Sequence, residues 1–179
     1  MTNSSSKRHS ELNPTLSQAE ALFREGWRLL DAGDDRRGAR ALLESARLGH
    51  VEAQQGVGYL FDVGKGVRRS VETAFKWYKI AARAGDAAAA ANIGTLYKEQ
   101  NKRTVAMRWF ERALRLGIPD VLLEIAQLRD STSCGRKSAR ADLRRLLRRK
   151  DVIQATREEA EALLRTLVRP SNIKQHRKQ

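Results

Sequence analysis

The chain has 179 residues, of which 41% are hydrophobic and 31% charged, which is typical of one globular domain with its own core. No run approaches the roughly 18 apolar residues of a membrane span, and the polar start lacks a secretory apolar segment. We therefore expect a cytoplasmic protein that does not contact a membrane. The single cysteine, Cys134, excludes an internal disulfide, and three histidines leave little material for a metal site.

The net charge of +14 is concentrated in one part of the chain. Residues 101–150 contain 14 Lys or Arg residues against 5 Asp or Glu residues, a net charge of +9. A basic surface attracts nucleic acid, anionic lipid and acidic proteins alike, so the charge alone does not select a partner.

Small residues recur at a spacing typical of helical hairpin arrays. Gly26, Gly58 and Gly94 are separated by 32 and 36 residues, and Ala126 follows 32 residues later. A second series, Gly49, Gly85 and Gly117, lies in step with the first. We interpret each unit as a helix with a small residue near its middle, a turn, and a second helix that ends at a glycine.

The apolar periodicity predicts helices in chain order, with Ser70, Asp86 and the Asp34–Asp35 pair as N-terminal caps. The expected pairs are 16–31 with 36–48, 51–63 with 70–84, 87–99 with 103–116, and 120–130 with 137–149, followed by a capping helix at 152–168. Residues 15–168 form the predicted repeat domain. Residues 1–14 and the basic segment 169–179 are predicted to be disordered tails.

The second hairpin carries a specific motif. Gly64-Lys65-Gly66-Val67 forms its turn, Trp77-Tyr78 lies in its second helix, and Ala81-Ala82 precedes the terminal Gly85. This hairpin resembles a Sel1-like repeat, a relative of the tetratricopeptide repeat. The resemblance implies an all-α, right-handed α-solenoid of about four hairpins, and a non-enzymatic adaptor for other proteins. The first and third hairpins lack the four-residue insertion, which predicts irregular curvature.

The resemblance also places the first helix of each hairpin on the concave side. Sixteen positions then face the groove, and seven are acidic while only Lys98 is basic. The predicted partner-binding residues are Trp27, Asp31, Glu52, Gln55, Tyr59, Asp62, Thr95, Lys98, Glu99, Gln127 and Asp130. The other five positions are Glu20, Phe23, Ala91, Asp120 and Leu123. We expect this groove to bind a basic protein or peptide segment, with the tail 169–179 as an internal competitor.

An alternative hypothesis assigns function to the basic second helices. The helix at 137–149 and the residue after it contain clustered bases, namely Arg140, Arg144, Arg145, Arg148, Arg149 and Lys150. Such a cluster can bind nucleic acid, but no interleaved aromatic residues accompany it, which favours a solvated face. A partner that is a nucleic acid therefore ranks second to a protein partner.

No catalytic constellation can be assembled from these residues. Gly64-Lys65-Gly66 lacks the glycine and the hydroxyl residue of a phosphate-binding loop. Cys134 has no paired histidine, and His50 lies at a hairpin junction where it is expected to satisfy a backbone group. We predict no enzymatic activity, no cofactor and no metal, and the sequence leaves the oligomeric state open.

Overall fold

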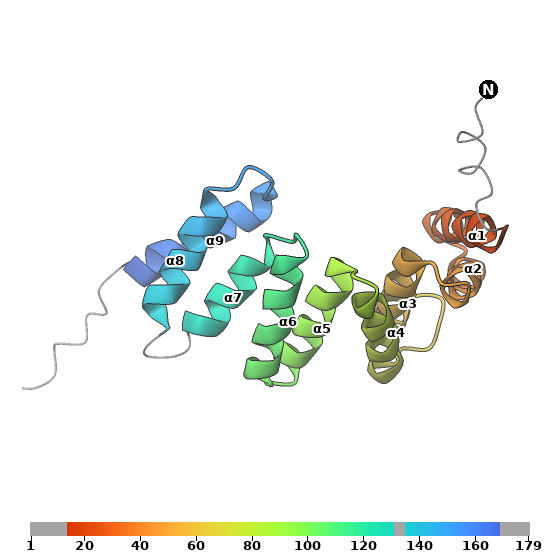
Figure 1. Ribbon diagram of the computed structural model, residues 1–179, viewed down its shortest axis with the longest axis horizontal. Coiled ribbons are helices and arrows are strands. Elements are labelled where there is room, and N and C mark those ends of the chain that lie inside the picture. The colour runs from red at the N-terminus through yellow and green to blue at the C-terminus, as the bar shows by residue number, and fades with distance from the viewer. Residues whose placement is uncertain (1–13, 131–134, 169–179) are drawn as a thin grey trace, which may run out of the picture. The chain divides into compact units, whose positions relative to one another are not determined.

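The computed structural model describes residues 14–130 and 135–168, and these residues form nine α-helices in an all-α fold. Figure 1 shows them in chain order, joined by short connections. The helices are α1 (Pro14–Asp31), α2 (Asp35–Arg47), α3 (Val51–Val63), α4 (Val71–Arg83), α5 (Ala87–Glu99), α6 (Arg103–Arg115), α7 (Val121–Asp130), α8 (Arg136–Leu147) and α9 (Gln154–Val168).

The predicted helices are confirmed with bounds that differ by at most two residues. Their ends follow from local hydrogen bonding. The side chains of Ser70 and Asp86 accept hydrogen bonds from the backbone N–H groups of Thr73 and Ala89, at 3.2 and 2.6 Å. Gly85 has the left-handed φ of 97° that glycine adopts without strain after a helix.

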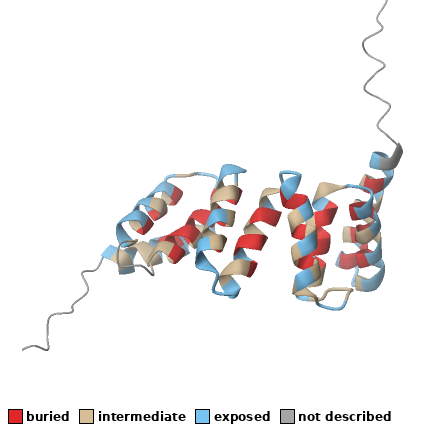
Figure 2. Cartoon of the chain, turned by 60° about the horizontal axis from the view of Figure 1, so that its bottom comes forward, coloured by how far each residue is buried: buried red, intermediate tan, exposed pale blue. Residues whose placement is uncertain are grey.

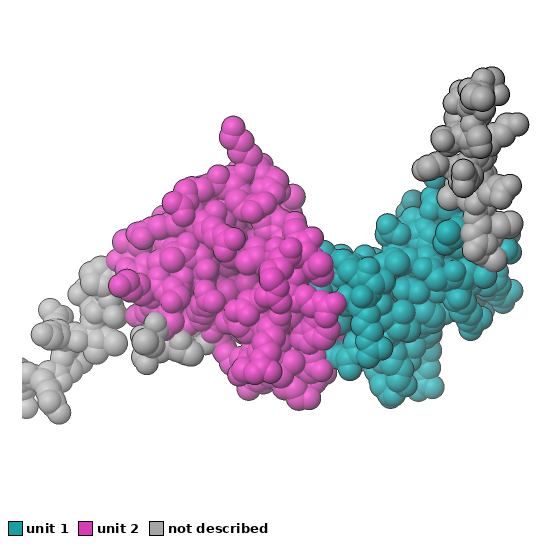
Figure 3. Space-filling model, in the orientation of Figure 1, with its two compact units in different colours: residues 1–93 teal, residues 94–179 magenta. Residues whose placement is uncertain are grey.

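The chain divides into two compact units, residues 1–93 (unit 1) and 94–179 (unit 2), so that the division falls within α5 (Figure 3). In unit 1 one core cluster joins three helices, with Leu30 from α1, Leu42 from α2, and Val57 and Leu60 from α3. In unit 2 a second cluster joins α7, α8 and α9 through Leu122, Leu143, Leu146 and Ala160. In Figure 2 the buried residues lie along the helices, and exposed residues are frequent in the turns.

The small residues lie where the paired helices approach each other most closely. A Cβ atom added to Gly26 would stand 2.7 Å from Cγ of Leu42, and one added to Gly94 would stand 2.7 Å from Cε1 of Phe110. Side chains at these positions would collide with the second helix of the same hairpin. The repeat of small residues therefore marks the contacts between the helices of each hairpin, as predicted.

Within the described ranges, no helix combines the length and the apolar character needed to cross a membrane.

Candidate protein-binding face

The predicted partner-binding residues of unit 1 lie on its first helices, α1 and α3, and we call this surface the acidic face. It consists of Trp27, Asp31, Glu52, Gln55, Tyr59 and Asp62. On α3, Glu52 and Tyr59 are exposed, and Gln55 and Asp62 are half-buried. Their spacing places them along one side of the helix, because most of the intervening residues point into the core.

Trp27 joins the two helices of the acidic face. Its Cζ2 atom would lie 3.1 Å from a Cβ atom on Gly56, so the indole covers the glycine backbone in α3. Trp27 also packs against the unit 1 core and meets Phe23 edge to face, with ring centroids 6.4 Å apart. Trp27 is half-buried, so it stabilises the core of unit 1 and also contributes to the acidic face. Tyr59, at 42% exposure, is the freer of the two predicted aromatic anchors.

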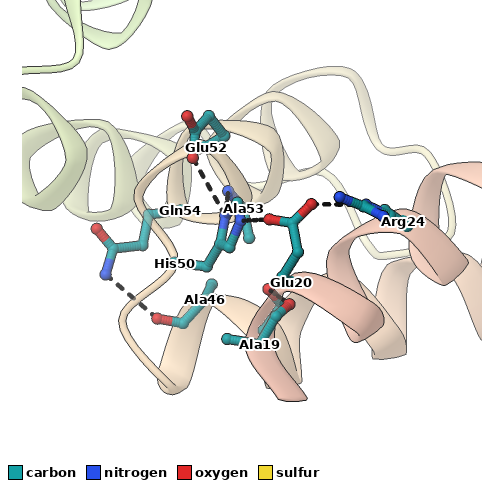
Figure 4. A network of polar contacts seen from close by, with 9 residues as sticks. Ala19, Glu20, Arg24, Ala46, His50, Glu52, Ala53 and Gln54 are labelled. Carbon is teal, nitrogen blue, oxygen red and sulfur yellow. Dashed lines mark hydrogen bonds and ion pairs between the residues drawn. The ribbon is translucent and has the colours of Figure 1, made fainter. Parts of the chain in front are cut away.

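His50 connects the end of the acidic face to α1 (Figure 4). Its Nδ1 accepts a hydrogen bond from the Ala53 N–H at 3.2 Å and so caps α3, as expected for a residue at a hairpin junction. Its Nε2 lies 2.8 Å from Oε2 of Glu20, and its ring stacks on Phe23 at a centroid distance of 4.5 Å. Glu52 approaches the same ring, with its Oε2 at 3.3 Å from Nδ1.

The carboxylates on and next to the acidic face differ in how far neighbouring groups within the chain already neutralise them. The hydrogen bond with His50, followed by that from Arg24, lowers the pKa of Glu20 below its ordinary value. Among the described residues, the carboxylates of Asp31 and Asp62 make no ion pair. The negative charge that is most available to a partner is therefore on Asp31 and Asp62, whereas Glu52 is exposed but approaches the His50 ring.

In unit 2 the corresponding first-helix residues contact each other. The ammonium group of Lys98 pairs with Glu124 and donates a hydrogen bond to Oε1 of Gln127 at 3.3 Å. The Gln127 amide in turn donates to Glu159 of α9 at 3.1 Å. These contacts join α5, α7 and α9. Two of the predicted partner-binding residues, Lys98 and Gln127, therefore already have partners within the chain.

The remaining predicted residues of unit 2 separate into two kinds. Thr95 and Glu99 are exposed, whereas Asp130 lies 3.5 Å from the guanidinium of Arg136. The prediction that Leu123 faces the groove is wrong, because its side chain is 6% exposed and belongs to the unit 2 core. The apolar stripe of α7 is wide enough to include it. Glu124, which the sequence pattern does not single out, takes part in the surface network instead.

The basic residues of the alternative hypothesis lie on α8 and just after it. Arg144, Arg145, Arg148 and Lys150 are exposed and Arg140 is half-buried. Arg149 forms a two-pronged pair with Asp151, with a shortest distance of 2.6 Å, and Asp151 raises its pKa mainly through that hydrogen bond. Arg149 therefore has an acidic partner within the chain.

The described residues contain no group of three or more His, Cys, Asp or Glu side chains placed to hold a metal ion. Cys134, His9, His176 and the basic tail 169–179 lie outside the described residues.

Stacked helical hairpins with small residues at the helix contacts define the α-solenoid class of repeat proteins. Within that class, residues 51–86 and 87–118 each match the Sel1 repeat. The two matches confirm the resemblance to Sel1-like repeats seen in the sequence.

Solved structures of similar fold include other repeat proteins. A Sel1 repeat protein from Oxalobacter formigenes superposes with a TM-score of 0.69 at 22% identity, over 86% of this chain and 66% of that protein. The protective antigen c5321 of uropathogenic Escherichia coli, which displays an SLR fold, gives 0.63 at 19% identity, over 84% of this chain and 45% of the antigen. The MamA protein gives 0.60 at 16% identity, over 85% of this chain and 87% of MamA.

The chain thus spans about two thirds of the Oxalobacter protein and less than half of c5321. No curated protein matches it in sequence. At these identities the likeness concerns the fold alone. Sel1 repeats are a non-catalytic fold, and proteins that contain them generally act as scaffolds for protein–protein interaction.

Proposed function

We propose that this chain is a non-enzymatic scaffold whose acidic face binds a basic segment of a protein partner. The observation that carries the proposal is the α3 stripe of Glu52, Gln55, Tyr59 and Asp62, which is accessible and acidic in a chain of net charge +14. The acidic face has the opposite sign to the net charge of the protein. It therefore attracts basic segments, which the rest of the protein surface repels.

The side chains of the acidic face suit a basic, partly apolar segment. Asp31 and Asp62 form no ion pair within the described residues that a partner would have to break. Tyr59 offers an aromatic surface about one helical turn from Asp62 on α3, and Tyr is among the residues that most often anchor interfaces. The carboxylates then set orientation and on-rate, while the aromatic ring supplies affinity.

Binding of a short fluorescein-labelled peptide, in which lysines flank a central leucine, tests this proposal by fluorescence anisotropy. We expect Tyr59→Ala to weaken binding several-fold, because the exposed ring is lost while the core stays intact. We expect Glu52→Lys with Asp62→Lys to abolish binding at the concentrations where the wild-type protein saturates. Trp27→Ala is a poor test because the indole also packs against Gly56.

The matched control replaces acids outside the acidic face. Glu44→Lys with Glu72→Lys changes the net charge by the same amount at exposed positions of α2 and α4. Equal losses with this control would show that only net charge governs binding, and the proposal would be rejected. Indifference to both Tyr59→Ala and the Glu52/Asp62 pair would also reject it.

The second candidate is a nucleic-acid-associated protein that uses α8. The observation in its favour is that Arg144, Arg145 and Arg148 are exposed and have no ion pair among the described residues. Retention on duplex DNA or RNA should then be lost when these arginines and Arg149 are changed to Gln, and should fall steeply with salt. Absence of retention for the wild-type protein at moderate salt would end this alternative.

A further inference from the structure

A groove of opposite charge lies beside α2 in unit 1. One side of α2 forms its first wall, and the turn between α3 and α4 forms the second wall. Leu43 supplies apolar surface from α2 and Val67 supplies it from the turn, above the buried Ala39. We call this feature the arginine groove because three arginines of α2 line it. It is formed entirely by residues 36–67, within unit 1.

The four-residue insertion of the second hairpin builds the second wall. Gly66 has a φ of 71°, and a Cβ atom there would stand only 2.0 Å from the backbone oxygen of Asp35. The turn is therefore seated directly on the start of α2. The ammonium group of Lys65 lies 3.6 Å from Asp35, which holds the turn in the same place. Because the first and third hairpins lack the insertion, they have no equivalent second wall.

The arginines of the groove are arranged for an anionic ligand. Arg36, Arg40 and Arg47 share one side of α2, since their spacings of 4 and 7 residues correspond to about one and two helical turns. All three are exposed, and none has an ion pair among the described residues. Glu44 is the one acid among the lining residues. The lining therefore carries a net positive charge around an apolar floor.

We propose that the arginine groove binds an acidic protein segment in which an apolar side chain is flanked by carboxylates. The apolar side chain lies on Leu43 and Val67, and the carboxylates pair with Arg40 and with Arg36 or Arg47. Charge complementarity selects this occupant over a basic segment, and the apolar floor selects a protein segment over a simple anion. The scaffold then has two faces on one unit that accept segments of opposite charge.

The proposal is tested with the full chain and a short fluorescein-labelled peptide in which glutamates flank a central leucine. We expect the triple variant Arg36→Gln, Arg40→Gln, Arg47→Gln to weaken binding roughly tenfold, which is what two exposed charge pairs supply together. Glutamine preserves helix propensity, and circular dichroism checks that the helix content is unchanged. A peptide with glutamine in place of glutamate should bind no better to the wild-type protein than to the triple variant.

A gain-of-binding variant makes the test independent of folding losses. Glu44→Gln removes the one acid of the lining and should tighten binding of the acidic peptide about twofold to threefold. The control Glu72→Gln on α4 removes an exposed acid elsewhere in unit 1 and should leave the affinity unchanged.

A second triple variant separates the groove from net charge. The combination of Arg24→Gln, Lys76→Gln and Arg83→Gln removes the same charge from exposed positions of unit 1 outside the groove. An equal loss of acidic-peptide binding in this control would overturn the proposal. Self-association in sedimentation experiments that the groove variant alone abolishes would also overturn it, because the occupant would then be a second copy of the chain.

Discussion

The aromatic ring of Tyr78 lies so close to the backbone of Gly58 that a Cβ atom on residue 58 would stand 2.5 Å from ring atom Cδ1. Tyr78 is 1% exposed, and burial raises the pKa of its hydroxyl above the ordinary value of 10.0. The tyrosine of the Trp77-Tyr78 pair thus acts as a neutral core residue. The ring can occupy this position only because residue 58 of α3 is a glycine. In unit 2, the ring of Phe110 lies against Gly94 in the same way.

We predict that Gly94→Leu lowers the free energy of unfolding by about 1–3 kcal/mol, because the new side chain overpacks the contact with Phe110. Thermal unfolding should show a melting temperature lower by several degrees. The control Ala88→Leu introduces the same side chain at an exposed position of α5 and should change stability by less than about 0.5 kcal/mol. Equal effects of the two substitutions would contradict the close contact.

A second prediction compares two glycines with similar backbone conformations. Gly33 has a φ of 83° and open space around its Cα, whereas Gly66 has a φ of 71° and the Asp35 carbonyl within collision distance. Gly33→Ala should lower the free energy of unfolding by about 1 kcal/mol through backbone strain alone. Gly66→Ala should lower the free energy of unfolding by more than this, and should also weaken acidic-peptide binding, because the turn must move away from α2. Denaturant unfolding measures both free energies. Equal losses would show that the turn does not pack closely on Asp35.

The third prediction concerns the cap that His50 provides to α3. His50→Ala should destabilise the protein by about 1 kcal/mol, since the Ala53 N–H loses its acceptor. His50→Asn supplies another side-chain acceptor at the cap position and should recover much of that loss. Urea unfolding near neutral pH measures the difference. An asparagine variant no more stable than the alanine variant would assign the effect to the lost stacking with Phe23 instead.

The same network predicts an acid-sensitive contribution to stability. The pKa of Glu20 is lower in the folded protein, chiefly because of its hydrogen bond with His50. A lowered pKa stabilises the fold above the unfolded value of about 4.5, and this contribution is lost as the pH falls through the folded pKa. Glu20→Gln should therefore reduce the slope of stability against pH in the acid range. An unchanged slope would show that the contact has no energetic effect.

A fifth prediction distinguishes two Lys–Glu pairs. Lys98 and Glu124 are partly buried, with side chains 38% and 32% exposed, whereas Lys76 and Glu72 are 69% and 81% exposed. Double-mutant cycles with alanine should give a coupling energy of about 0.5–1 kcal/mol for the first pair and close to zero for the second. Equal coupling in both pairs would mean that the network of α5, α7 and α9 adds nothing to a surface contact.

Local sequence was enough to predict the helices, their ends and the contacts between the helices of each hairpin. Apolar periodicity and capping residues act within about one helical turn, so Ser70, Asp86 and Gly85 could be placed without knowledge of the fold. The glycine series was equally informative, because helices that pack at close range need a residue without a side chain at each point of contact.

Which side chains meet across helices depends on the tertiary arrangement. Leu123 could not be distinguished from a surface residue by spacing, because α7 is apolar around most of its circumference. The pairing of Lys98 with Glu124 and the seating of Gly66 on Asp35 join residues 26 and 31 positions apart. Such contacts depend on how the hairpins stack, which local periodicity does not encode.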